Sequence, residues 1–153
     1  MSRAFVKELE DGVEKLPERP ISPHPNLVTA EGLAHIEAEV ARLQQEHATA
    51  HAANDRTALV RAARDLRYWT ARRATAQLVA APSDRSKVHF GSTVTIVRND
   101  GRRQTFRIVG EDEADPARGT LSHVSPLARA LFGKELGDTA KVAQSEAEIV
   151  EIA

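Results

Sequence analysis

The sequence contains no cysteine, and that absence removes several kinds of chemistry at once. Disulfide bridges, thiol nucleophiles and cysteine-ligated zinc sites all require cysteine side chains. A chain without cysteine is also typical of a reducing compartment. We therefore expect a cytoplasmic protein that is held together without covalent cross-links.

The chain also has few aromatic residues, a net charge close to zero and no long apolar run. Aromatic residues make up 4% of the chain, which favours thin helical packing over one thick core. The net charge of −1 gives no sign of a nucleic-acid partner. No stretch approaches the run of about 18 apolar residues that a membrane helix needs, and Met1–Glu8 lacks the apolar run of a signal peptide. A Gly-x-Ser-x-Gly elbow, a phosphate loop and a dinucleotide fingerprint are also missing, so enzymes of those classes are not indicated.

The chain divides into three segments of different character. We predict an N-terminal arm over residues 1–26, a coiled-coil hairpin over 27–82 and a compact domain over 83–153. The arm is expected to be extended, because proline fixes φ and removes a backbone donor. Phe5 and Val6 are its candidate anchors. The arm holds four of the seven prolines: Pro17, Pro20, Pro23 and Pro25.

Two antiparallel helices are predicted for the hairpin. Thr29 suits an N-cap, and Glu31 lies in the first turn, where the helix dipole favours an acid. Asn54 suits the left-handed conformation that ends a helix, and Asp55 or Thr57 can cap the next one. Each arm of about 24 residues would be roughly 36 Å long. Spacings of three and four, the a/d rhythm of a coiled coil, relate Leu33, Ile36, Val40, Leu43, His47 and Ala50 in the first arm and Leu59, Ala62, Leu66, Trp69, Arg73, Ala76 and Ala80 in the second.

The two arms carry opposite charges, which favours their pairing within one chain. Arg73 interrupts the apolar seam of the second arm, so we expect its head to lie in solvent near the base. The alternative reading of the arginines is a basic face that meets RNA or an acidic protein surface. The first arm carries Glu31, Glu37, Glu39 and Glu46 against Arg42, and the second carries Arg56, Arg61, Arg64, Arg67, Arg72 and Arg73 against Asp55 and Asp65.

The last segment changes from helical to strand periodicity. The turn Asn99–Gly101 between alternating apolar residues is the strongest hairpin signal in the chain. Ser125 and Pro126 predict the start of a short helix that Gly133 closes. We therefore predict an α+β protein in which a small antiparallel sheet with one short helix follows the helical hairpin. The expected strands include Val94 and Ile96, Thr105–Val109, Leu121–Val124, Thr139–Val142 and Ala147–Ile152, with a loop at Asp112–Pro116.

Few side chains suggest chemistry of their own. His47 and His51, four residues apart on one helix, can share a metal ion, but no third ligand is evident, and polar surface histidines are favoured. The remaining candidates have plain structural readings: Trp69 as a packing residue at the base of the hairpin, His89 and His123 as structural residues of strand-like segments, Asp55 as a helix cap, and the acidic loop Glu111, Asp112, Glu113 and Asp115 as a solvated loop in preference to a divalent-cation site.

Residues 26 to 153 resemble the GreA/GreB family of bacterial transcription elongation factors. Four strings carry the resemblance in the family's order: Asn26–Leu33 at the start of the coiled coil, Phe90–Ile96 at the first strand of the C-terminal domain, Arg107–Asp115 and Ser125–Asp138. The GreB-like side of the family is the more similar one.

The resemblance implies an FKBP-like C-terminal domain without prolyl isomerase activity. In this family that domain docks on RNA polymerase at the rim of the secondary channel, and the coiled coil enters the channel. Acids at the tip then complete the polymerase's Mg²⁺ site, and backtracked RNA is cleaved. Nucleic acid is contacted only within the elongation complex. The docking residues expected from the resemblance are Ser125, Pro126, Arg129, Ala130, Gly133, Lys134, Gly137 and Asp138.

The tip departs from the family pattern, in which Gly-Asp is followed shortly by Glu-Asn. Asp55 is the only tip candidate for a catalytic acid, and the arms look roughly two turns shorter, like those of Rnk, a relative that binds polymerase without cleaving. We therefore predict a monomeric, non-catalytic polymerase-binding regulator with weak or no cleavage stimulation and no cofactor of its own. One alternative is an active cleavage factor in which Asp55 and Glu46 bring Mg²⁺ to the polymerase site. The other is a protein that dimerises through its coiled coil.

Overall fold

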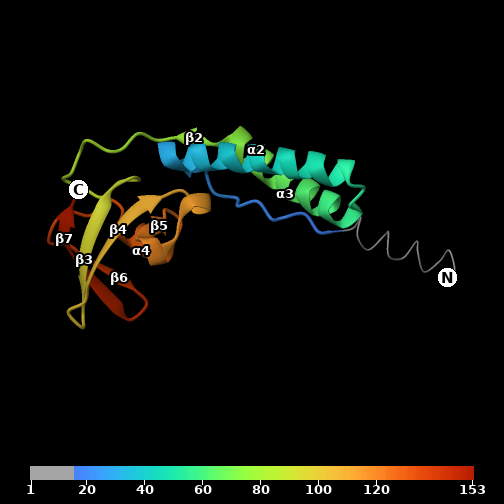
Figure 1. Cartoon of the computed structure of the whole chain (residues 1–153). Helices are drawn as coiled ribbons and strands as arrows, with labels where there is room; N and C mark the ends of the chain where they lie inside the picture. Colours follow the sequence, from blue (N-terminus) through green and yellow to red (C-terminus); the bar gives the residue numbers. More distant parts are fainter. Residues whose placement is uncertain (1–15) are drawn as a thin grey trace. The chain divides into compact units, whose positions relative to one another are not determined.

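The computed structural model describes residues 16–153, so the anchor residues Phe5 and Val6 lie outside the described residues. The chain forms two compact units (Figure 1). One consists of the described part of Met1–Pro23 together with Ala34–Thr75, and the other of His24–Leu33 together with Ala76–Ala153. The predicted boundaries at 26 and 82 stay predictions. None of the helices within residues 16–153 is long and apolar enough to cross a bilayer.

The predicted helical hairpin is confirmed. Helix α2 (Ala30–Ala52) and helix α3 (Arg56–Thr75) form its arms and run antiparallel in Figure 1. Their lengths of 23 and 20 residues are close to the expected 24. Apolar residues on the predicted seam are buried because each arm covers the other: Ile36, Val40, Leu43 and Ala50 from α2, and Ala62 and Trp69 from α3.

The last turn of the α3 seam differs from the prediction. Arg73 is exposed, as expected for its head, but the buried residue of this turn is Arg72, which is 2% exposed. A straight helix has 3.6 residues per turn, so after Trp69 the buried face continues at a spacing of three and the expected spacing of four fails. Trp69 itself packs as predicted, with its ring edge-on to His35 at 5.4 Å between centroids.

The second unit contains a five-stranded sheet in the order β5-β4-β3-β7-β6. The antiparallel arrangement that we predicted holds for β3–β4, β3–β7 and β6–β7, but β4 and β5 are parallel. The physical reason is the crossover at residues 110–119, where the 3₁₀ turns Glu111–Glu113 and Pro116–Arg118 return the chain to the same end of the sheet. The strands are β3 (Thr93–Arg98), β4 (Arg103–Val109), β5 (Thr120–Ser122), β6 (Thr139–Val142) and β7 (Ser145–Ile152).

One helix, α4 (Pro126–Leu131), covers the core of this sheet, so the α+β class is confirmed. Ser125 caps it as predicted, because its hydroxyl accepts a hydrogen bond from the Ala128 amide at 3.2 Å. Gly133 follows the helix with φ +75°, a conformation that glycine adopts without strain. His89 and His123 lie outside the strands, contrary to the prediction, although His123 is buried. The core combines Val94, Ile96, Ile108, Ala147 and Ile149 of the sheet with Leu127, Ala128 and Leu131 of α4.

Two short strands that the sequence did not predict flank the hairpin. Strand β1 (Leu27–Val28) precedes α2, strand β2 (Gln77–Leu78) follows α3, and the two pair in parallel. Their backbone bonds continue on both sides, from the Gln77 amide to the Asn26 carbonyl and from the Val79 amide to the Val28 carbonyl. The two ends of the hairpin are therefore joined by main-chain hydrogen bonds within the second unit.

The start of α2 depends on a carboxylate from far along the chain. Glu113 accepts hydrogen bonds from the Thr29 amide at 3.1 Å, from the Thr29 hydroxyl and from the Gly110 amide at 3.2 Å. The Thr29 hydroxyl in turn accepts from the Gly32 amide at 3.0 Å, which confirms Thr29 as the N-cap. A Cβ added at Gly32 would lie 1.9 Å from a Glu113 carboxylate oxygen. Glycine at position 32 therefore leaves room for the carboxylate.

This geometry predicts that substitutions at Gly32 and Glu113 are strongly coupled. Gly32→Ala alone should destabilise the protein, because the new methyl group displaces the carboxylate that holds Thr29. Glu113→Ala should cost about 2 kcal/mol, because buried donors lose their acceptor. In the Glu113→Ala background the same Gly32→Ala change should become neutral or stabilising by up to about 1 kcal/mol, as alanine is the better helix former. Urea unfolding of the four proteins measures this cycle, and additive effects would contradict it.

Candidate functional site

The tip of the hairpin is built from helix-ending signals. Asn54 has φ 52°, the left-handed conformation that the sequence predicted, and the Asp55 amide donates to the Ala50 carbonyl at 2.9 Å. The Asp55 carboxylate then accepts a hydrogen bond from the Ala58 amide at 3.1 Å and caps α3. The capping role predicted for Asp55 is confirmed. The tip thus presents one exposed carboxylate, bound to a helix terminus and followed by Arg56.

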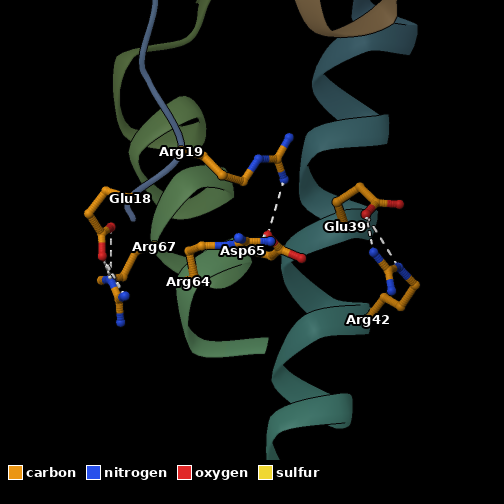
Figure 2. Close-up of polar contacts among 7 residues, drawn as sticks. All are labelled: Glu18, Arg19, Glu39, Arg42, Arg64, Asp65 and Arg67. Atoms are coloured by element: carbon orange, nitrogen blue, oxygen red, sulfur yellow. Dashed lines mark hydrogen bonds and ion pairs between the residues drawn. The ribbon is translucent and has the colours of Figure 1, made fainter. Parts of the chain in front are cut away.

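Glu46, the second acid considered for the tip, is engaged elsewhere on α2. Its carboxylate pairs with the Arg42 guanidinium at 2.6 Å. Figure 2 shows that Arg42 also holds Glu39, at 2.6 Å. The hydrogen bond from Arg42 keeps the pKa of Glu39 below its ordinary value. Glu46 is therefore part of an ion-pair network along one face of the helix.

The other candidate metal ligands do not come together. Within residues 16–153 no group of three or more histidine or acidic side chains is placed to hold a metal ion. His47 and His51 lie on α2 without a third ligand. In the acidic loop, Glu113 caps α2, and the Asp115 carboxylate accepts from the Ala117 amide at 3.2 Å. Two of the four acids of this loop, Glu113 and Asp115, therefore serve helix and turn termini.

The predicted docking residues form the outer side of α4 and the turn that follows it. Ser125 and Lys134 are half-buried, and Arg129 and Gly133 are exposed. Arg129 also lies 3.3 Å from a ring nitrogen of His24. Leu136, 64% exposed, is a large apolar residue in this region that the sequence reading missed. Its only sequence signal was its position between polar residues of a turn. Pro126, Gly137 and Asp138 are exposed as well, and Ala130 is half-buried.

A Ser-Asp-His cluster lies before β3 and was also missed. The Asp84 carboxylate accepts from the Ser86 hydroxyl at 2.6 Å and the Ser86 amide at 2.8 Å, and it lies 3.1 Å from the His89 ring. In a hydrolase triad the histidine stands between the serine and the acid, whereas here the acid stands between the other two. His89 is therefore not placed to take the Ser86 proton, and the hydrogen bonds of Asp84 stabilise the turn at Asp84–Ser86.

The contacts of Asp84 predict that Ser86 lowers the pKa of its carboxyl group more than His89 does. The Ser86 hydroxyl, the Ser86 amide and then the His89 ring lower the pKa of Asp84 to about 2. Because the folded pKa lies below the ordinary value of 3.8, the turn is fully stabilised above that value and loses this stabilisation as the pH falls towards 2. Carboxyl NMR titration should show a larger rise in this pKa for Ser86→Ala than for His89→Ala. The reverse order would refute the assignment.

Comparisons with known proteins agree on one family. The family model "Transcription elongation factor, GreA/GreB, C-term" matches residues 82–153. A GreA of Hyphomonas neptunium is 61% identical over 59 residues, 38% of each chain. A GreA of Alkalilimnicola ehrlichii is 41% identical over 115 residues, 71% of this chain and 72% of the relative. A GreA of Legionella pneumophila (strain Lens) is 38% identical over 143 residues, 80% of this chain and 88% of the relative.

GreA factor homolog 1 of Thermus thermophilus aligns with a TM-score of 0.41 and 21% identity over 85% of this chain and 99% of that chain. The relatives named above are GreA proteins, and the GreB-like character of the C-terminal domain stays a prediction. The sequence matches, one of them covering most of a GreA relative, confirm the resemblance found from the motifs. The chain belongs to the GreA/GreB family of transcription elongation factors.

Proposed function

We propose that this protein binds RNA polymerase, occupies its secondary channel with the α2–α3 hairpin, and stimulates transcript cleavage weakly or not at all. Family membership supports the partner, because the similar proteins are named transcription elongation factors. The protein is then a non-catalytic factor that acts on an enzyme. It works in the cytoplasm with the polymerase and meets nucleic acid only within the elongation complex.

The C-terminal domain supplies the docking surface. Residues 82–153 are the part that the family model matches, and α4 with its following turn exposes a cation, Arg129, and an apolar side chain, Leu136. Interfaces of this kind often combine an apolar contact with arginine. Docking through the outer residues of Ser125–Asp138 leaves the buried side of α4, with Leu127 and Leu131, in the core of the sheet.

The observation that carries the cleavage part of the proposal is the single carboxylate at the tip. Holding a second Mg²⁺ for phosphodiester hydrolysis needs acids that converge on one ion at about 2 Å. Asp55 already accepts a hydrogen bond from the Ala58 amide. Glu46 lies more than two turns before it and is paired with Arg42. Both acids could reach one ion only if α2 unwound.

The length of the hairpin arms also supports weak or absent stimulation of cleavage. Arms of 23 and 20 residues are roughly 30–35 Å long, and the sequence resemblance implies arms about two turns shorter than those of cleaving relatives. Misplacement of a reacting group by about 1 Å can cost about 10²-fold in rate. Most apolar seam residues of α2 and two of α3 are buried within the single chain, which supports an intrachain coiled coil and a monomer over a dimer formed through the hairpin.

Transcript cleavage on backtracked polymerase complexes tests the proposal. The wild-type protein should be retained by RNA polymerase core enzyme in a pull-down, yet leave the cleavage rate within about twofold of polymerase alone. Asp55→Asn should change neither result, because asparagine caps a helix as well as aspartate does while it removes the charge. Glu46→Gln is the matched control for the second acid.

Two outcomes would contradict different parts of the proposal. Strong cleavage that Asp55→Asn abolishes would establish the active-factor alternative, since the cap is preserved in that variant. Failure of the wild-type protein to bind the core enzyme would remove the polymerase as partner. A mass by light scattering that rises from monomer to dimer with concentration would instead favour the dimerising protein.

A further inference from the structure

A proline-rich segment of the chain lies on the hairpin. Residues 16–23, which we call the strap, have neither helix nor strand structure, and they belong to the same compact unit as Ala34–Thr75. Pro17, Pro20 and Pro23 lack the amide donors that a strand would need. Charged side chains of the strap instead make ion pairs with α3.

The strap is bound to α3 by two adjacent residues of opposite charge. Glu18 receives hydrogen bonds from the Arg67 guanidinium at 2.5 and 3.0 Å, and Arg19 pairs with Asp65 at 3.5 Å (Figure 2). The Arg19 guanidinium also lies 4.0 Å from the centre of the Tyr68 ring and 5.7 Å from that of Trp69. Each charged residue of the strap therefore pairs with a residue of opposite charge on α3: Glu18 with Arg67, and Arg19 with Asp65.

The α3 face at Asp65 and Arg67 is occupied by a peptide segment in which an acidic residue precedes a basic one. Asp65 pairs with Arg64 of the same helix as well as with Arg19, and the Glu-Arg sequence of the strap places opposite charges at both Asp65 and Arg67. The chain supplies that peptide itself. While the strap is bound, the carboxylate of Glu18 neutralises Arg67, and the backbone of the strap adds a further layer beside α3.

The strap is held weakly enough to be displaced. Glu18 and Arg67 have side chains 62% and 56% exposed, and such exposed ion pairs contribute little and are screened by salt. The cation–π contact of Arg19 with Tyr68 adds a modest attraction. Of the two large apolar residues of the strap, Ile21 is 51% exposed and adds little burial, and Leu16 is half-buried. A partner that binds the α3 face can therefore compete with the strap.

We propose that the strap is an autoinhibitory cover of the α3 face, and that it must leave this face before the hairpin can occupy the polymerase channel. This inference rests on the proposed function, because the polymerase is the partner with which the strap competes. If the strap covers this face in most molecules, the apparent affinity for polymerase is the intrinsic affinity multiplied by the fraction of molecules whose face is free. Releasing the strap should therefore tighten binding roughly 3- to 10-fold.

Fluorescence of the single tryptophan reports the strap without polymerase. Glu18→Arg places like charges together and should expose Trp69, shifting its emission to longer wavelength. The charge-swapped Glu18→Arg/Arg67→Glu protein should recover the wild-type spectrum. Glu146→Arg, which makes the same charge change at the Lys141 pair, should leave the spectrum unchanged. Unchanged emission in Glu18→Arg, or failure of the swap to restore it, would mean that these contacts do not hold the strap.

Binding to RNA polymerase core enzyme then tests inhibition. Glu18→Arg should bind roughly 3- to 10-fold tighter than the wild-type protein and Glu146→Arg equally well. A Glu18→Cys/Arg67→Cys protein, joined by a reducible thiol cross-linker, locks the strap closed, since the chain has no other cysteine. This protein should bind at least about 10-fold more weakly until the linker is reduced.

The outcomes separate the two proposals. If the strap opens by fluorescence but the opened and locked proteins bind polymerase as the wild type does, the autoinhibitory role is wrong and the proposed function stands. If neither the wild-type nor the opened protein binds the core enzyme, the proposed function fails and the competition with it. Tighter binding when opened together with weaker binding when locked supports both.

Discussion

The first turn of α2, where the hairpin begins, is held by the carboxylate of Glu113. Glu113 accepts hydrogen bonds from Thr29 and Gly110, and the missing side chain of Gly32 leaves room for it. Residues that are 84 positions apart are thereby joined at the start of α2, inside the unit that contains the sheet. The parallel pair β1–β2 joins the two ends of the hairpin by backbone bonds. Thr29 caps the helix, but Glu113 fixes the cap, so the hairpin depends on a loop of the C-terminal domain.

Sequence reasoning succeeded where the deciding interaction is local. The caps at Thr29, Asp55 and Ser125 each use a hydroxyl or carboxylate and an amide three residues later, so the sequence contains the whole interaction. It failed where partners are distant. Nothing near Glu113 indicates a bond to Thr29, so the loop was read as solvated, and the same holds for the parallel pairing of β5. The burial of Arg72 was missed because a strict heptad drifts against a helix of 3.6 residues per turn.

The candidate site shows the same division. The role of Asp55 as a cap was readable from the turn sequence, and the docking residues followed from family strings, although their contact with polymerase stays a prediction. The strap contacts of Glu18 and Arg19 had no periodic signal, because a proline-rich segment binds by single side chains. In the proposed function, the C-terminal domain docks on the polymerase and the short α2–α3 hairpin is the probe. The probe has one tip carboxylate, already used by a helix, and its basic arm is partly covered by the chain's own N-terminal strap.

The central claim is that this protein occupies the polymerase channel without supplying the acids for cleavage. The most direct measurement is transcript cleavage stimulated by a GreA protein on backtracked complexes, while increasing amounts of this protein are added. Competition for one channel predicts that cleavage falls towards the rate of polymerase alone, and that the opened Glu18→Arg variant reaches this level at a lower concentration. Cleavage that stays constant in the presence of excess protein, or that rises, would contradict the claim.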